Sequence, residues 1–383
     1  MRKRRRLSVA FFYAVVLTAG TYLVNNLPFL TGESLPLYAG LEYVKSQFSR
    51  PDTVLDSVLL IDVAYSRSIA EKEINGLHVG RTDVTDRQEL TKLLRNLKKC
   101  GYRYVFLDIR FEQGEETPFD RELFGEIRSM PNLVIANHAD ITLADSSLAG
   151  KAAYSDYPVT LTSTNFLRYR FLQRGGESMP LRAYRELGGP ESTIRKYGGI
   201  YLSDRKLCYN SLVINPLVPG FGRQAANAGG MAMMYQNLNW INDEESLSVL
   251  ARDKYVVIGN MTDDRHDTYF GKIPGSVIVF SAFWALKNGR HLVRPGQVIY
   301  FFLLYFILAF SLLGSGPVWK RIPFVRNSKS RLVRFLATLI GYSSVMTLAV
   351  SVLYFCSDTV SSILLPSLVF SIHKTYCDYK NQI

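Results

Sequence analysis

Short apolar runs alternate with amphipathic segments through the middle of the chain. Each run ends at a polar residue or a glycine, and the four are Val58–Ile61, Val105–Leu107, Leu133–Ala136 and Val256–Ile258. Consecutive rather than alternating apolar positions are typical of strands that are buried on both faces of a parallel sheet. The pattern therefore predicts four central strands.

Three helices are predicted between or after these strands. The first begins where Thr85 and Gln88 have capping-box spacing and ends at Gly101. Its apolar face consists of Leu90, Leu93, Leu94 and Leu97. The second begins at Thr117–Pro118, and its expected buried residues are Phe119, Leu123, Phe124 and Ile127. The third runs from Ser276 to Asn288 and is closed by Gly289.

This order of strands and helices predicts the fold class. Alternating strands and helices are typical of an α/β domain with a mostly parallel sheet and flanking helices. Residues 141–245 contain more alternating, strand-like segments, and we expect them to form a β-rich elaboration packed against the sheet. The expected domain covers residues 26–296.

Charge-free apolar stretches at both ends predict membrane helices. Leu7–Val24 has 18 residues without a charge, enough at about 1.5 Å per residue to cross most of a hydrocarbon core. We expect this first helix, within residues 1–25, to remain as an uncleaved anchor, because it is longer than the apolar core of a signal peptide. In the C-terminal region 297–383, further helices are predicted near 298–318, 335–356 and 359–376, the last interrupted by Pro366.

The basic residues predict the topology. The chain carries 45 Lys and Arg against 33 Asp and Glu. The excess lies before the first helix and in the loop 319–334, which leaves residues 26–296 nearly neutral and removes the support for nucleic-acid binding. Because Lys and Arg favour the cytoplasmic side, we expect a multi-pass protein of the inner membrane with a cytoplasmic N-terminus and residues 26–296 exported. For the loop, lipid contact is a simpler interpretation than docking of a signalling partner.

Familiar catalytic and redox motifs are absent from the sequence. It contains no G-x-S-x-G, P-loop, H-E-x-x-H or dinucleotide fingerprint, so we expect no enzyme activity. Its cysteines form no C-x-x-C pair, and we expect Cys100 and Cys208 to be two buried thiols rather than a disulfide.

Polar residues at the ends of the predicted strands form the candidate ligand site. In open α/β sheets, ligands bind outside the carboxyl ends of the strands. Asp62 and Asp108 end the first two strands, and polar residues also follow the third and fourth. The expected ligand-binding residues are Asp62, Arg81, Asp108, Asp264, His266, Asp267 and Thr268, with His138, Asp140, Asp263 and Arg265 nearby in the sequence. They could hold a divalent cation or a polar ligand, or Asp62 and Asp108 could instead cap turns and helix starts.

The order of these motifs resembles a known family. Val58-Leu-Leu-Ile-Asp62, Val105-Phe-Leu-Asp-Ile-Arg-Phe111 and Val257-Ile-Gly-Asn-Met-Thr-Asp-Asp264, followed by His266-Asp-Thr268, Gly271 and Pro274-Gly275, resemble the type-two CHASE domain. This is the cyclase/histidine-kinase-associated sensory extracellular domain. The resemblance implies an N-terminal anchor, an exported sensory domain and a following group of membrane helices.

The resemblance also implies a sensory function, in a stand-alone form. Such domains normally precede a cytoplasmic output domain, and the residues after the last apolar stretch are too few to form one. We therefore expect an integral-membrane sensor that binds a small molecule, an ion or a protein and signals to a separate partner. The alternatives are a membrane-anchored exported enzyme, such as a metal-assisted hydrolase, and a structural envelope protein.

Overall fold

The computed structural model divides into two compact units. It describes residues 3–26, 35–48, 57–74, 76–156, 168–189, 192–213, 236–268, 271–314, 330–357 and 361–380. One unit, here the membrane unit, comprises Met1–Phe48, Lys196–Ser211 and Arg290–Ile383. The other, here the α/β unit, comprises Ser49–Arg195 and Leu212–Gly289. Residues 196–211, which the sequence patterns placed in the elaboration, thus belong to the membrane unit.

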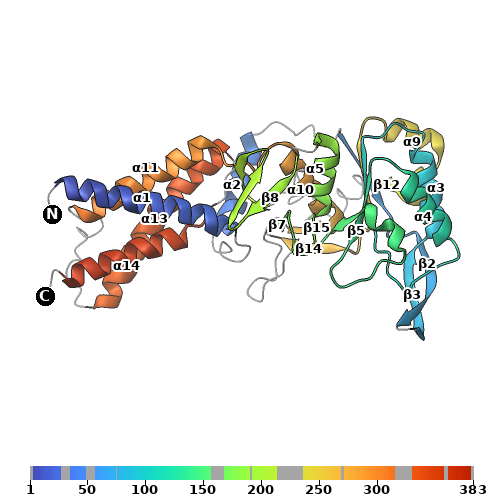
Figure 1. Cartoon of the computed structure of the whole chain (residues 1–383), viewed down its shortest axis with the longest axis horizontal. Coiled ribbons are helices and arrows are strands. Elements are labelled where there is room, and N and C mark those ends of the chain that lie inside the picture. Colours follow the sequence, from blue (N-terminus) through green and yellow to red (C-terminus); the bar gives the residue numbers. More distant parts are fainter. Residues whose placement is uncertain are drawn as a thin grey trace. The chain divides into compact units, whose positions relative to one another are not determined.

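A six-stranded parallel sheet forms the centre of the α/β unit (Figure 1). Its order is β12 (Gln236–Asn237), β1 (Val58–Asp62), β13 (Tyr255–Gly259), β4 (Tyr104–Asp108), β5 (Leu133–Asn137) and β6 (Ala152–Tyr154). The four predicted apolar runs are the four strands in the middle of this order, so the predicted parallel sheet is confirmed. In register, Asp62 pairs with Gly259 and Gly259 with Asp108, which brings three strand ends to one edge.

Helices cover both faces of the sheet. On one face, α3 (Arg87–Leu97), α4 (Asp120–Ser129), α8 (Leu238–Ile241) and α9 (Glu244–Leu250) enclose an apolar core with alternate strand residues such as Val105 and Leu107. On the other face lie α5 (Met179–Gly188) and α10 (Gly275–Lys287). Here the ring of Phe106 lies 5.1 Å from that of Phe283. Successive strand residues point to opposite faces, so these continuous apolar runs supply both cores.

Two details of the predicted helices are wrong. The N-cap of α3 is Asp86, whose Oδ1 accepts hydrogen bonds from the amides of Gln88 and Glu89, while Thr85 is the last residue of a strand. Phe119 is 42% exposed because it is the N-cap residue of α4, one position before the helix begins.

An antiparallel hairpin that the apolar patterns did not predict precedes α3. It consists of β2 (Arg67–Ile74) and β3 (Leu77–Thr85) and projects from the α/β unit (Figure 1). A second hairpin, β14 (Arg265–Thr268) and β15 (Gly271–Pro274), leads into α10. The described part of the elaboration also contains η3 (Ser146–Gly150), β7 (Tyr169–Arg170), β8 (Ile194–Tyr197), β9 (Ile200–Ser203), β10 (Lys206–Cys208) and β11 (Ser211–Leu212).

Apolar helices dominate the membrane unit. They are α1 (Lys3–Asn25), α2 (Leu35–Phe48), α11 (Pro295–Leu313), α13 (Arg331–Ser357) and α14 (Leu364–Lys380). Among the described residues, three helices are long and apolar enough to cross a membrane, namely Arg4–Asn25, Pro295–Leu313 and Arg331–Ser357. The helix predicted near 359–376 begins at Leu364. Most of the predicted loop 319–334 lies outside the described residues. Cys100 and Cys208 are free and buried, as expected.

Candidate functional site

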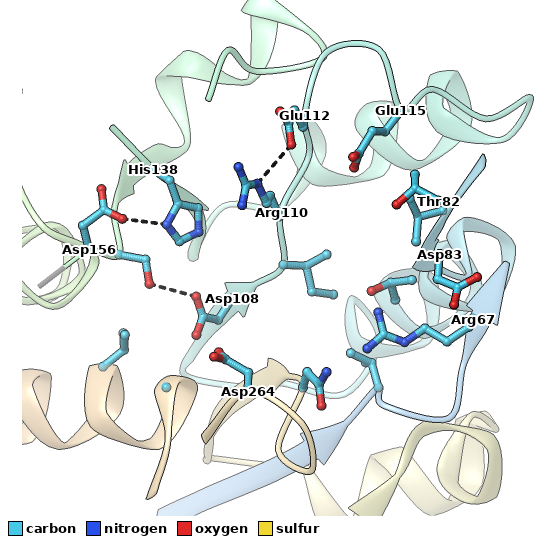
Figure 2. Close-up of a pocket in the computed structure, with 18 of the residues that line it drawn as sticks. Arg67, Thr82, Asp83, Asp108, Arg110, Glu112, Glu115, His138, Asp156 and Asp264 are labelled. Atoms are coloured by element: carbon cyan, nitrogen blue, oxygen red, sulfur yellow. Dashed lines mark hydrogen bonds and ion pairs between the residues drawn. The ribbon is translucent and has the colours of Figure 1, made fainter. Parts of the chain in front are cut away.

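A cavity of about 720 Å³ opens at the carboxyl ends of β4, β5 and β13 in the α/β unit. Asp108, His138, Asn260 and Asp264 line it from these strand ends and the loops that follow them, and the β2–β3 hairpin forms the facing wall (Figure 2). This is where a parallel sheet presents polar side chains to a ligand. The cavity is therefore the candidate binding site of the unit.

Asp108 is the carboxylate at the end of the central strand β4. Its Oδ1 accepts a hydrogen bond of 2.9 Å from the Ser155 hydroxyl. Burial raises the pKa of Asp108 above its ordinary value, and the neighbouring Asp264 carboxylate raises it further, whereas the Ser276 and Ser155 hydroxyls and His138 oppose this. Among the described residues, no Lys or Arg forms an ion pair with Asp108, so its negative charge is incompletely compensated.

Asp264 and His266 approach the cavity beside the start of α10. His266 Nε2 lies 3.2 Å from Asp264 Oδ1. The positions of both side chains require a residue without a Cβ at position 275. A Cβ on Gly275 would lie 2.7 Å from Asp264 Oδ2 and 2.9 Å from His266 Nε2. The Pro274–Gly275 pair thus leaves space for a carboxylate and an imidazole at the first turn of the helix.

His138 is held in place by Asp156 on the other side of Asp108. The His138 Nδ1 lies 2.8 Å from Asp156 Oδ1 (Figure 2), and Asp156 Oδ2 accepts a hydrogen bond from the Ala139 amide. The backbone carbonyl of Asp156 in turn accepts a hydrogen bond from the Gln173 side chain. These contacts fix the orientation of the imidazole.

The charged side chains of the hairpin and of the segment after β4 are mostly paired. Lys72 Nζ lies 2.7 Å from Glu115 Oε1, and this contact raises the pKa of Lys72 above its ordinary value. Arg110 contacts Glu112 at 3.2 Å, and Arg67 contacts Asp263 at 3.7 Å. In total, three Lys and Arg side chains line the cavity against six Asp and Glu. The lining is therefore negative overall when its histidines are neutral.

Asp62 has a different environment from Asp108, although both end a strand. Its Oδ1 accepts hydrogen bonds from the amides of Ala64 and Met261, and its Oδ2 accepts one of 2.7 Å from the Thr262 hydroxyl. It is only 5% exposed and does not line the cavity. Asp62 therefore fastens the loop after β13 to the end of β1, in agreement with the capping alternative.

The remaining residues expected at the site lie in the two hairpins or on the surface. Arg81 is exposed on β3, opposite Glu71, and does not line the cavity. Asp267 and Thr268 belong to β14, where the Thr268 hydroxyl donates to the Gly271 carbonyl. Asp140 is exposed and lies 3.4 Å from Arg110. The structure thus brings Asp108, Asp264 and His266 together at one cavity with His138, and leaves the others outside it.

Several lining residues were missed from the sequence. They include Arg67, Lys72, Asp83, Glu115, Asp156 and Tyr169. The hairpin had one clear signal, the Asn75–Gly76 dipeptide, which favours a two-residue turn. Asp156 had none, because only the fold brings it to His138. Among the described residues, no three His, Cys, Asp or Glu side chains are grouped so that they could hold a metal ion.

Comparison with known proteins gave one finding. The family model described as the CHASE2 domain matches residues 43–316, which covers most of the chain. No curated protein and no solved structure gave a match.

Proposed function

Because this chain belongs to the CHASE2 family of sensory extracellular domains, we propose that it is a membrane-anchored sensor whose α/β unit binds a small molecule in the cavity at Asp108. Signals would pass through the apolar helices to a separate partner. The proposed topology places the N-terminus in the cytoplasm and the α/β unit outside the inner membrane, as the basic clusters of the sequence favour.

The observation that carries this proposal is the incompletely compensated carboxylate of Asp108. Asp108 lies in a cavity of ligand size, its pKa is raised by burial and by Asp264, and among the described residues it has no basic ion-pair partner. A half-buried carboxylate without a basic partner reduces stability when it is ionised, so it is rarely retained for structural reasons. Perturbed carboxyl groups in a cleft are typical of functional sites.

The charge and shape of the cavity indicate the class of ligand. A cation beside Asp108 and Asp264 would relieve the repulsion between the two carboxylates. The rest of the lining includes apolar side chains, among them Val63, Ile109, Ile278 and Val279. An organic cation, with an ammonium or guanidinium group and an apolar part, fits both features.

Thermal unfolding of the full chain in lipid nanodiscs tests this function. The panel contains organic ammonium and guanidinium compounds, their neutral and carboxylate isosteres, and magnesium and calcium salts. A ligand at about 100 times its Kd adds roughly 2.7 kcal/mol of stability. For a protein unit of this size, that corresponds to a rise in Tm of roughly 5–10 °C.

Two variants test whether the rise in Tm comes from binding at this cavity. In Asp108→Asn the shift should disappear, whereas Asp253→Asn is the matched control, because Asp253 is exposed and its φ of 57° is one that Asn adopts readily. If only the carboxylate compounds raised Tm, the proposal that the ligand is a cation would be wrong, although small-molecule sensing would stand. A panel without any shift would contradict small-molecule sensing at this cavity.

A further inference from the structure

The membrane unit contains a second, chemically different cavity. It is an apolar groove of about 560 Å³ between α1, α11 and the β9–β10 hairpin. Its lining includes Val15 and Leu23 of α1, Ile200 and Leu207 of the hairpin, and Val298 and Phe302 of α11. The lining is almost entirely apolar, unlike that of the cavity at Asp108.

The walls of the groove are fixed by hydrogen bonds within the membrane unit. The Tyr22 hydroxyl of α1 accepts from the Tyr201 amide and donates to the Cys208 carbonyl, both at 3.0 Å. On the other side, the Val293 amide donates to the Leu207 carbonyl at 2.8 Å. The hairpin is thereby attached to the end of α1 and to the segment that precedes α11. These hydrogen bonds hold the walls of the groove in place.

The groove is open to the exterior along α1 and α11. Several of its lining side chains are well exposed, including Val15, Leu23 and Ile299. Both α1 and α11 are long and apolar enough to cross a membrane. Because the medium around such helices is lipid, an acyl chain is the occupant that matches the lining.

Two segments that contribute to the groove lining are rich in basic residues. Residues 196–211 and 290–297 contain five Lys and Arg but only one Asp or Glu. The bases are Lys196, Arg205, Lys206, Arg290 and Arg294. In the proposed topology these two segments lie at the extracytoplasmic ends of α1 and α11, where Lys and Arg are normally scarce. Lys206 lies 3.9 Å from Asp204, and the remaining net positive charge of the two segments would be balanced by an anionic partner, such as a phosphate headgroup.

We propose that this groove binds one acyl chain of an anionic phospholipid from the extracytoplasmic leaflet, with its phosphate bound by the basic residues of these two segments. The bound lipid fills the space between α1, α11 and the β9–β10 hairpin. Since the chain runs from the α/β unit into this hairpin and back again, the lipid contacts a segment through which a signal can travel along the sequence. The site is independent of the cavity at Asp108.

Native mass spectrometry of the full chain, released from nanodiscs of phosphatidylglycerol or phosphatidylcholine, tests the proposal. One phosphatidylglycerol should remain bound under conditions that strip phosphatidylcholine. The double variant Lys196→Gln, Lys206→Gln should weaken its retention by about fivefold for each lysine. Lys92→Gln with Arg121→Gln, two exposed positions of the α/β unit, is the matched charge control.

A second variant tests the groove itself. Ala19 is exposed and lines the groove, so Ala19→Phe should occupy the space of the chain and remove the retained lipid without burying a larger side chain in a core. Glycerol phosphate, which has the charge but no chain, should not displace the lipid. Equal retention of both phospholipids, full retention in Ala19→Phe, or displacement by glycerol phosphate would overturn the proposal.

Discussion

At the scale of single residues, the carboxyl group of Asp108 makes the stability of the protein depend on pH. Its pKa is raised in the folded protein by burial and by the Asp264 carboxylate, so folding favours the protonated carboxyl. The ionised form reduces the stability of the ligand-free protein at neutral pH. This loss is relieved as the pH falls through the folded pKa towards the ordinary value for Asp, about 3.9.

The variant Asp108→Asn should therefore be more stable than the wild type at neutral pH, because an amide carries no charge and still accepts the Ser155 hydrogen bond. The difference in Tm should shrink as the pH falls from about 7.5 to about 4. Thermal unfolding of both chains across this range is the measurement. A difference that stays constant or grows on acidification would show that the charge at Asp108 is not the cause.

Gly275 gives a second prediction at this scale. In Gly275→Ala, the new Cβ would lie within 3 Å of the Asp264 and His266 side chains, which must move, so we expect the affinity for a cationic ligand to fall about tenfold or more. Gly125→Ala in α4 is the control, since the nearest atom to its new Cβ is 4.0 Å away. The control should gain about 0.5–1 kcal/mol of stability and keep its affinity. Equal affinities in the two variants, measured by calorimetric titration, would contradict this geometry.

At the scale of elements, the β2–β3 hairpin projects from the α/β unit (Figure 1) and forms one wall of the cavity. An isolated two-stranded hairpin is marginally stable. This one is attached by the Lys72–Glu115 ion pair and by the hydrogen bond from the Glu73 amide to the Gly114 carbonyl. Gly114 has a φ of +87°, and a Cβ there would lie 2.2 Å from the Glu73 carbonyl oxygen.

Gly114→Ala should therefore detach the hairpin at this contact. The combined clash and left-handed backbone should lower stability by about 1–3 kcal/mol. Amide hydrogen exchange at Glu73 should become faster, while exchange in the central strand β4 should change much less. Gly150→Ala is the control, because nothing lies within 4 Å of its new Cβ. Unchanged protection of the Glu73 amide would show that this contact does not hold the hairpin.

The elements differ in how well the sequence predicted them. The central strands are continuous apolar runs bounded by polar residues, a pattern typical of strands that are buried on both faces of a parallel sheet. The β2–β3 hairpin has mixed polar and apolar positions, and few of them are buried, so only the Asn75–Gly76 dipeptide could have indicated it.

The site was predicted in part, for a related reason. Asp62 and Asp108 both end an apolar run, so local sequence cannot distinguish them. Their difference comes from a distant segment, since Met261 and Thr262 satisfy Asp62 from about 200 residues away in the chain. Which carboxylate faces the cavity is thus a property of the tertiary fold.

At the scale of the whole molecule, the chain combines a CHASE2 domain with helices that can cross a membrane. The two cavities differ in chemistry, one lined by an excess of carboxylates and the other by apolar side chains. We propose that the first detects a solute and that the second holds the surrounding lipid. The central claim is the first of these, that a ligand binds at the strand ends beside Asp108.

Hydrogen exchange of the full chain in nanodiscs, with and without the organic cation that raises Tm most, tests this claim most directly. The ligand should slow exchange at the backbone after β4, around Ile109 and Arg110, and in the loop from Asn260 to His266. The same protection should be absent in Asp108→Asn. Protection confined to other surfaces, or protection that survives in Asp108→Asn, would contradict a sensory site at this cavity.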